Sequence, residues 1–283
     1  MFFFLGLGTS SAKEAREYFS DIEKHTVRFV YDGKASDESI DLAFAKNKAD
    51  ERKLWIAECS KLEPAAAGGA SDTNRAERTF SEFINKELVE YSQLDLRRSL
   101  PNVIDGLKPS QRKVLYTMFE RYERGEVRVS QLAGAVSQYC GYHHGEESLV
   151  NTIVRLAQDF VGSNNLNLLL PLGQFGTRLA GGEDAASARY IYTALSPLAR
   201  AVFPRLDDKI LKYLVEENAS IEPQWYCPVI PMILVNGAEG IGTGWATKIL
   251  PRCPRQIIEN TQRLIDGRPM QTMVIFCCDR FSL

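Results

Sequence analysis

The sequence lacks the features that mark membrane proteins, zinc modules and strongly charged proteins. No apolar run comes near ~18 residues, the length that a membrane-spanning helix needs, so we expect an intracellular protein with no membrane partner. The six cysteines form no CxxC pair and no Cys/His zinc spacing, which favours free thiols in a reducing compartment. The formal net charge is only −2, so any nucleic-acid site must be a local basic patch.

Such a local patch is present. Eight basic residues between positions 97 and 128 stand against four acidic ones. Three of them, Lys108, Arg112 and Lys113, lie at the start of a helix that Pro109 is placed to open, where backbone amide dipoles also favour a phosphate. A solvated helix face often has the same pattern, so the charges alone leave both interpretations open.

Hydrophobic spacing predicts three helices followed by a strand and a turn. Helices are expected from Pro109 to about residue 121, over 131–139 before Gly141, and over 146–160. Residues 168–178 then form an apolar strand and a glycine-punctuated turn that ends in a basic residue. Two short helices with a tight turn, followed by such a strand, predict a helix-turn-helix with a β-wing and hence an α+β fold.

The rest of the chain gives coarser signals. We expect a linker at 61–79, where small residues gather and no apolar period is visible. Further helices are expected at 11–20, 40–57, 80–91 and 255–266, and a β-rich stretch with several glycines at 228–245.

A loop of small residues, 181–188, ends in Arg189 and Tyr190. A tyrosine phenol has a pKa of about 10 and is a poor nucleophile unless a cation stabilises its oxygen or the transition state. Arg189 is placed to do this through charge-assisted hydrogen bonds to a phosphoryl oxygen. Two such common residues, taken alone, more often have a plain packing or surface role.

Two neighbouring histidines, His143 and His144, precede the third predicted helix. Adjacent side chains face different ways on most backbones, so one of them can meet a phosphate while the other packs. No cysteine or acidic residue stands at a spacing that would complete a metal site. A structural or solvated role for both histidines therefore competes with phosphate binding.

Seven short segments stand in a fixed order along the chain. They are GLGTS at 6–10, DGLKPSQRKVL at 105–115, YHHGEESL at 142–149, FVGSNN at 160–165, GQFGTR at 173–178, SARY at 187–190 and NGAEGIGTGW at 236–245. Together they resemble the eukaryotic type IIA DNA topoisomerases, in the order and with the spacing found in that family. The resemblance covers roughly residues 6–273, and coincidence of several independent motifs in one order is implausible.

The resemblance implies four parts. Residues 1–60 would be the C-terminal remnant of the metal-binding TOPRIM domain, followed by the linker at 61–79. Residues 80–200 would form a winged-helix DNA-cleavage domain. Residues 201–283 would begin an α/β tower domain and end in an atypical tail.

The resemblance also implies a chemistry. Tyr190 matches the tyrosine that attacks a DNA phosphodiester, stays on the 5′ phosphate and frees a 3′ hydroxyl, and Arg189 matches the arginine that steadies the transition-state charge. Ile241 matches an isoleucine that wedges between base pairs, which unstacks a step and bends the duplex. The residues that match DNA-contacting positions are Lys108, Arg112, Lys113, His143 and His144.

Members of the family use Mg²⁺ and ATP, and we expect this chain to hold the binding residues of neither. In the family, the metal-binding carboxylates precede the GLGTS segment, and the ATPase domain lies elsewhere. Without the metal, the pair of Tyr190 and Arg189 should cleave poorly. The implied partners are double-stranded DNA and a second subunit, either a copy of this chain or a full-length topoisomerase, in the nucleus.

Two other interpretations stay open. The terminal segments 1–5 and 274–283 depart from the family, which suggests a partial gene product or a truncated paralogue that binds DNA or a full-length subunit without cutting. A winged-helix transcription regulator is a more distant alternative, because it would need neither the Arg189–Tyr190 pair nor Ile241.

Overall fold

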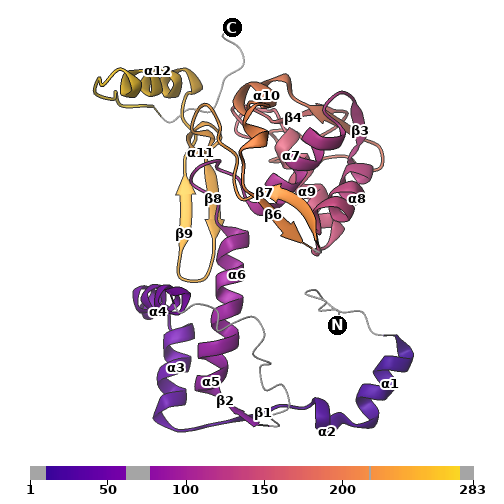
Figure 1. Cartoon of the computed structure of the whole chain (residues 1–283), viewed down its shortest axis with the longest axis vertical. Coiled ribbons are helices and arrows are strands. Elements are labelled where there is room, and N and C mark those ends of the chain that lie inside the picture. The colour runs from indigo at the N-terminus through magenta and orange to yellow at the C-terminus, as the bar shows by residue number, and fades with distance from the viewer. Residues whose placement is uncertain (1–10, 62–76, 217, 275–283) are drawn as a thin grey trace. The chain divides into compact units, whose positions relative to one another are not determined.

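The computed structural model describes residues 11–61, 77–216 and 218–274, which form two compact units (Figure 1). The first unit holds the described residues up to Ser99 together with Ile241–Ala246, and the second holds the other described residues from Leu100 onwards. The GLGTS segment, most of the predicted linker and nearly all of the atypical tail lie outside the described residues. The two compact units divide after Ser99.

The first unit is mainly helical. Its elements are α1 (Ala12–Ser20), α2 (Ile22–His25), β1 (Arg28–Val30), α3 (Lys34–Phe44), η1 (Lys46–Lys48), α4 (Ala49–Lys61), β2 (Glu77–Thr79), α5 (Phe80–Phe83), the π-helical turn η2 (Ile84–Leu88) and α6 (Val89–Ser99). The predicted helix at 11–20 is confirmed, and a capping box between Ser11 and Glu14 fixes its start. Strands β1 and β2 pair in parallel, so the end of the predicted linker is a strand.

The prediction of one helix over 40–57 is wrong. Ala45 adopts an extended backbone (φ −65°, ψ 132°) between α3 and the turn η1 that leads into α4. The break frees carbonyl groups at the end of α3, and the Arg52 guanidinium donates hydrogen bonds to the carbonyls of Leu42 (3.0 Å) and Ala45 (2.8 Å). A helix end stabilised by a side chain from the next helix leaves no signal in hydrophobic spacing.

The second unit begins with three helices and a small sheet. The elements are α7 (Pro109–Arg121), β3 (Glu126–Arg128), α8 (Val129–Cys140), α9 (Glu146–Ala157), β4 (Leu169–Leu172), β5 (Tyr192–Leu195) and α10 (Pro197–Val202). The sheet is antiparallel in the order β3-β5-β4, so β5 is central, with Tyr192 opposite both Arg128 and Leu172. The three predicted helices and the predicted strand are confirmed, although α8 starts two residues earlier than expected and α9 ends at Ala157.

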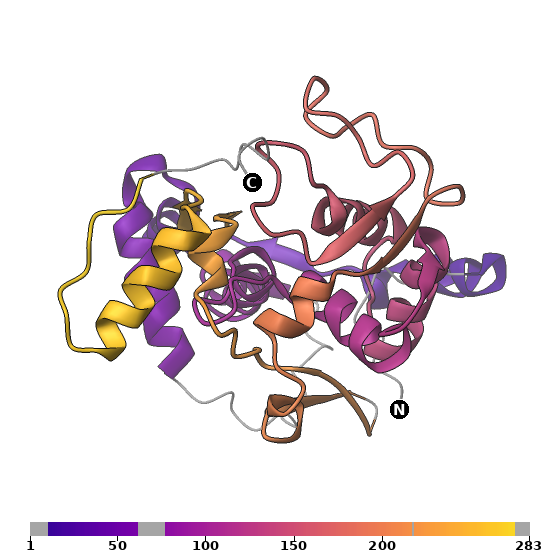
Figure 2. The same cartoon turned by 90° about the horizontal axis from the view of Figure 1, so that it is seen from above.

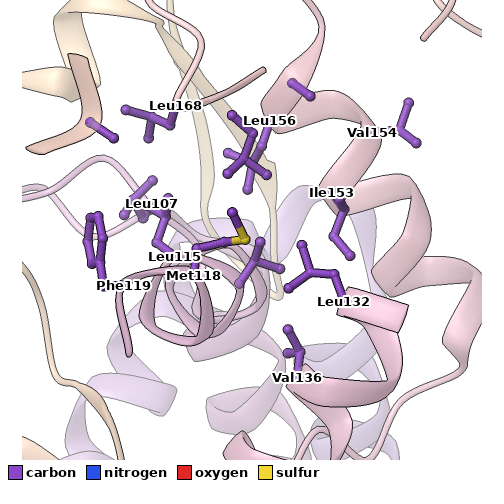
Figure 3. Close-up of a cluster of buried hydrophobic side chains, with 14 of the residues drawn as sticks. Leu107, Leu115, Met118, Phe119, Leu132, Val136, Ile153, Val154, Leu156 and Leu168 are labelled. Carbon is purple, nitrogen blue, oxygen red and sulfur yellow. The ribbon is translucent and has the colours of Figure 1, made fainter. Parts of the chain in front are cut away.

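The apolar faces of the three helices form one core under the sheet. Leu115 and Met118 on α7, Leu132 on α8 and Ile153 on α9 are fully buried and belong to one cluster, in which Leu115 and Met118 lie centrally (Figure 3). Each lies on the apolar face of its helix. The strand and loop that follow α9 are therefore held on a rigid support.

The remaining elements are shorter. They are η3 (Asp207–Lys209), β6 (Tyr213–Glu216), β7 (Ala219–Pro223), α11 (Met232–Val235), β8 (Ala238–Ile241), β9 (Ala246–Ile249) and α12 (Pro254–Ile265). The predicted β-rich stretch at 228–245 is only partly correct, because Met232–Val235 is a helical turn. A short buried apolar run looks the same in either structure. Among the helices of the described residues, none has both the length and the apolarity to span a bilayer.

Candidate active site

Tyr190 lies in the long loop 173–191 that joins β4 to β5 (Figure 2). Its side chain is 72% exposed. Its backbone N–H donates to the Ser187 carbonyl at 2.9 Å, which closes a turn directly before the central strand. The sequence therefore presents this hydroxyl to solvent rather than burying it.

The backbone on both sides of Tyr190 is anchored to the start of α8. The N–H of Ser130 donates to the carbonyl of Ala188 (3.2 Å), and the N–H of Val129 donates to the carbonyl of Ile191 (3.1 Å). Amides in the first turn of a helix have no partner within that helix, so these two are available for the loop. The nucleophile candidate thus has an exposed side chain on a fixed backbone.

Packing adds a third restraint beside the tyrosine. Ile191 is buried in the core, and its side chain lies against Gly173 at the other end of the loop. A Cβ at Gly173 would stand 2.9 Å from the Ile191 Cγ2 atom, and the backbone there has a φ of +126°. Glycine is required at this position because the two ends of the loop approach so closely.

Two arginines supply positive charge near this loop. The Arg189 side chain is exposed, and its guanidinium carbon lies 5.8 Å from the centroid of the Tyr190 ring. Arg128 precedes α8 and donates to the Tyr192 hydroxyl at 2.7 and 3.2 Å. Arg128 is the last of the eight basic residues between positions 97 and 128, and no local pattern predicts its role because its partner is 64 residues away.

A second feature of this unit is a polar groove of about 830 Å³ between the start of α7 and α9. Lys108 lies at its edge, half-buried, and its backbone N–H donates to the Gln111 side chain at 2.8 Å. The other basic and neutral polar side chains that line the groove are Ser110, Ser148, Asn151, Thr152, Arg155, Ser163, Asn236 and Lys248. Glu147 and Glu239 line it as well, so the groove carries both signs of charge.

Arg112 does not face this groove with a free guanidinium. Its Nε and Nη2 atoms donate to both carboxylate oxygens of Asp105 (2.8 and 3.1 Å), and Nη2 also donates to the Leu107 carbonyl (3.0 Å). The Arg112 side chain is 6% exposed and that of Asp105 is fully buried. The expectation of a direct phosphate contact therefore conflicts with this geometry, because the buried ion pair would first have to break.

Lys113 is also engaged inside the protein. Its ammonium group donates to the Glu222 carboxylate at 3.0 Å and to the Cys140 carbonyl at the end of α8. Burial raises the pKa of Glu222, and the charge of Lys113 partly opposes that rise. Lys113 thus joins α7, α8 and β7 and does not present its charge to solvent.

The two histidines have different partners, as their adjacency suggested. The Nε2 atom of His143 lies 2.7 Å from a Glu216 carboxylate oxygen. The His144 ring packs edge-on against Tyr142, with 5.4 Å between ring centroids. Both histidines are exposed, and Gly141 in the left-handed conformation ends α8 just before them.

Ile241 belongs to the first unit and is 76% exposed at the end of β8. The turn after it is fastened to α6, because the backbone and hydroxyl of Thr243 both donate to Asp95 (3.2 and 3.3 Å). An exposed apolar side chain on a fastened hairpin has the geometry that a wedge needs.

Within residues 11–61, 77–216 and 218–274, no three His, Cys, Asp or Glu side chains gather in a way that would hold a metal ion. The described residues thus do not fit a Mg²⁺ site. The four cysteines in this part of the chain, Cys59, Cys140, Cys227 and Cys253, are free.

Comparison with known proteins identifies the family of the chain. Residues 98–277 match the family model for the A-type subunit of DNA gyrase/topoisomerase IV. The chain belongs to this family of type II DNA topoisomerases. Residues 1–96 match the model of the C-terminal associated domain of TOPRIM, so the two matches meet close to the boundary between the two units.

Individual relatives agree with the family models. The chain is 54% identical over 277 residues to DNA topoisomerase 2 top-2 of Caenorhabditis elegans, covering 96% of the chain and 18% of the relative. It is 52% identical over 271 residues to human DNA topoisomerase 2-beta, covering 94% of the chain and 17% of the relative. The chain therefore spans less than a fifth of the length of these relatives.

A solved structure is similar as well. The DNA-binding, cleavage and re-ligation domain of Plasmodium falciparum topoisomerase II matches with a TM-score of 0.75 and 48% identity. The match covers 97% of this chain and 37% of that one. The mixed helix and sheet fold is thus that of a topoisomerase II cleavage domain.

Proposed function

We propose that this chain is the DNA-breaking segment of a type II DNA topoisomerase and that Tyr190 is its nucleophile. The observation that carries the proposal is an exposed phenol on a backbone fixed at Ala188 and Ile191, with the Arg189 guanidinium beside the ring. Membership of the family and the likeness to a cleavage and re-ligation domain support it.

The step that this geometry favours is a transesterification. The Tyr190 oxygen attacks a backbone phosphorus, an O–P bond forms, the bond from phosphorus to the 3′ oxygen breaks, and the phenol proton leaves to solvent. The 3′ oxygen takes up a proton, and the reverse attack reseals the strand. Arg189 stabilises the charge that develops on the phosphoryl oxygens, a role worth about 3–4 kcal/mol for a well-placed donor.

We further propose that the second unit contains a winged helix. The element order α7-β3-α8-α9-β4-β5, with β5 central, supports it, and the loop 173–191 would be the wing. In this proposal the first unit is the C-terminal remnant of TOPRIM, and the tower begins after about residue 200. The winged-helix domain expected at 80–200 would then begin after Ser99, where the second unit starts.

The polar groove beside α7 is the proposed path of the DNA backbone. Lys108, Arg155 and Lys248 offer positive charge there, together with hydroxyl and amide donors. His143 and His144 are proposed as further contacts, and Ile241 as the wedge between base pairs. Arg112 and Lys113 are assigned a different role, since their buried pairs fix the start of α7 and the position of Lys108.

The proposed partners and cofactors follow the family. Double-stranded DNA is the proposed substrate. A second subunit, either a copy of this chain or a full-length topoisomerase, would supply the second tyrosine. The proposed location is the nucleus. Mg²⁺ and ATP are proposed for the full-length protein, and the metal would supply a positive charge that stabilises developing oxyanions.

The test uses a duplex in which sulfur replaces the bridging 3′ oxygen at the cleaved bond. A thiol has a pKa of about 8.5 and leaves without the help of a metal, so the chain is tested as it stands. The unsubstituted chain should form a detergent-resistant adduct on the 5′ phosphate. Tyr190→Phe should form none while binding DNA equally well, and Tyr91→Phe, an exposed tyrosine of the first unit, should behave like the unsubstituted chain.

An adduct formed equally by Tyr190→Phe would refute the assignment. A chain that binds DNA in a salt-sensitive way and forms no adduct would instead be the non-catalytic paralogue.

A further inference from the structure

Gln158 is the C-cap residue that directly follows α9, and it is almost completely buried, with 6% of its surface exposed. Its side-chain amide donates two hydrogen bonds, to the carbonyls of Phe175 (2.9 Å) and Gly182 (3.1 Å). These carbonyls lie on the outgoing and returning arms of the loop that carries Tyr190. One amide therefore fastens both arms to the end of the helix.

The backbone of the loop is shaped to receive this amide. Gly182 has a φ of +85°, and a Cβ there would stand 2.3 Å from the Gln158 Nε2 atom. Gly176 has a φ of +96°, and a Cβ there would stand 2.6 Å from the Gly182 backbone. Both glycines are needed for these close approaches, which a surface contact would not require.

The arms are also tied to each other. The Thr177 backbone N–H and hydroxyl donate to the two carboxylate oxygens of Asp184 (2.7 and 2.8 Å), and these bonds lower the pKa of Asp184. Further along, the N–H of Ala186 donates to the Gln174 carbonyl at 2.9 Å. The two arms of the loop are therefore joined to each other, and Gln158 attaches them to the end of α9.

The returning arm and α9 form the walls of a second groove, of about 580 Å³. Residues 181–183 and 185–188 line one wall, and Val150, Val154 and Arg155 line the other, with Gln158 between them. The arm reaches Tyr190 two residues after Ala188. The hydrogen bonds of Gln158 thus set how far the arm stands from α9 and, through the arm, where Tyr190 is held.

We propose that Gln158 is a positioning residue for Tyr190, an inference that rests on the proposed function. Gln158 does not touch the DNA. It sets the distance between α9, which lines the proposed DNA path, and the arm that ends in the nucleophile. Removing its two donor hydrogens should leave DNA binding unchanged and slow the chemical step.

The test compares two variants. Gln158→Met keeps the length of the side chain and loses both N–H donors. Gln158→Glu keeps the shape of the side chain but places a carboxyl group against the two carbonyls. Gln262→Met, an exposed glutamine on α12, is the matched control. Adduct formation on the 3′-sulfur duplex should fall about 100-fold for Gln158→Met at every pH, the loss expected from a displacement of about 1 Å. DNA affinity should stay within twofold of that of the unsubstituted chain.

The pH profile separates positioning from general destabilisation. The carboxyl group introduced by Gln158→Glu regains one donor when it is protonated. The rate of this variant, relative to the unsubstituted chain, should therefore recover as the pH falls, whereas Gln158→Met should show no recovery. Trypsin cleavage after the exposed Arg178 should be faster in both variants and unchanged in the control.

The outcomes are distinct. If the unsubstituted chain forms no adduct, the proposed function fails and this role fails with it. Two results would refute the positioning role alone, provided that the unsubstituted chain forms the adduct. In the first, Gln158→Met forms the adduct equally fast. In the second, trypsin cleaves the loop faster but the rate of adduct formation does not fall. Slow adduct formation with unchanged DNA affinity and the predicted pH recovery supports it.

Discussion

Replacing Arg112 with Met tests whether this residue supports the fold or contacts DNA. The substitution leaves the Asp105 carboxylate fully buried with two backbone donors, the N–H groups of Leu107 (2.9 Å) and Tyr226 (3.0 Å). Removing one partner of a buried ion pair typically costs 3–5 kcal/mol. Because two backbone hydrogen bonds to Asp105 remain, we expect a loss near the lower limit, about 3 kcal/mol.

Urea unfolding measures this loss as a change in midpoint at constant slope. Arg112→Lys is the graded control, since it keeps the charge and loses the forked hydrogen bonds, and should cost about 1–2 kcal/mol. Replacing both partners, with Asp105→Asn and Arg112→Met together, should cost less than the sum of the two single substitutions.

DNA binding supplies the second half of the test. The slope of DNA affinity against salt concentration should be unchanged in Arg112→Met, because the guanidinium contacts no phosphate. The measurement is made under conditions in which the variant is folded. Lys108→Met should reduce the slope by about one unit with little change in stability. An Arg112→Met variant of full stability with a reduced salt slope would refute the assignment and restore the role that the charge pattern first suggested.

Two further predictions use other features of the two units. Ile241→Ala should reduce DNA bending, measured by fluorescence transfer between the duplex ends, more than it reduces affinity, because the exposed side chain has no packing role; an unchanged bend would remove the wedge. Burial raises the pKa of Glu222 above its ordinary 4.5, so the folded chain holds this proton more tightly than the unfolded chain. Stability from this group is present below pH 4.5 and is lost as the pH rises through the raised pKa. Glu222→Gln should abolish that component in denaturation curves taken across this range, and an identical pH dependence in the variant would contradict it.

Much of the second unit could be predicted from the sequence. The stripe of Leu115 and Met118 on α7 and the left-handed stop at Gly141 depend on residues close together in the chain, which hydrophobic spacing and glycine preferences report directly. The loop before Tyr190 was visible for the same reason, since small residues follow an apolar strand.

The side-chain partners could not be predicted in this way. A basic residue at a helix start looks the same whether it faces a phosphate or a buried carboxylate, so Asp105 was counted as one more surface charge. The partners of Lys113 and His143 lie 109 and 73 residues away, and no local pattern links them. The role of Gln158 could not be predicted, because a glutamine at a helix end is common and only the structure shows its two carbonyl acceptors.

The anchors of the Tyr190 loop on α8 are made by main-chain atoms, and this has a consequence for variation among related chains. Ala188 is half-buried against the core, and exchanging its side chain for another small one leaves its carbonyl where it is, so the anchor of the tyrosine depends on the main chain. Adding or deleting one residue between Ala188 and Ile191 would misalign both carbonyls with their amides. For the main-chain anchoring of this short stretch, its length is therefore the property to preserve, whereas Arg189 and Tyr190 within it are fixed by their chemistry.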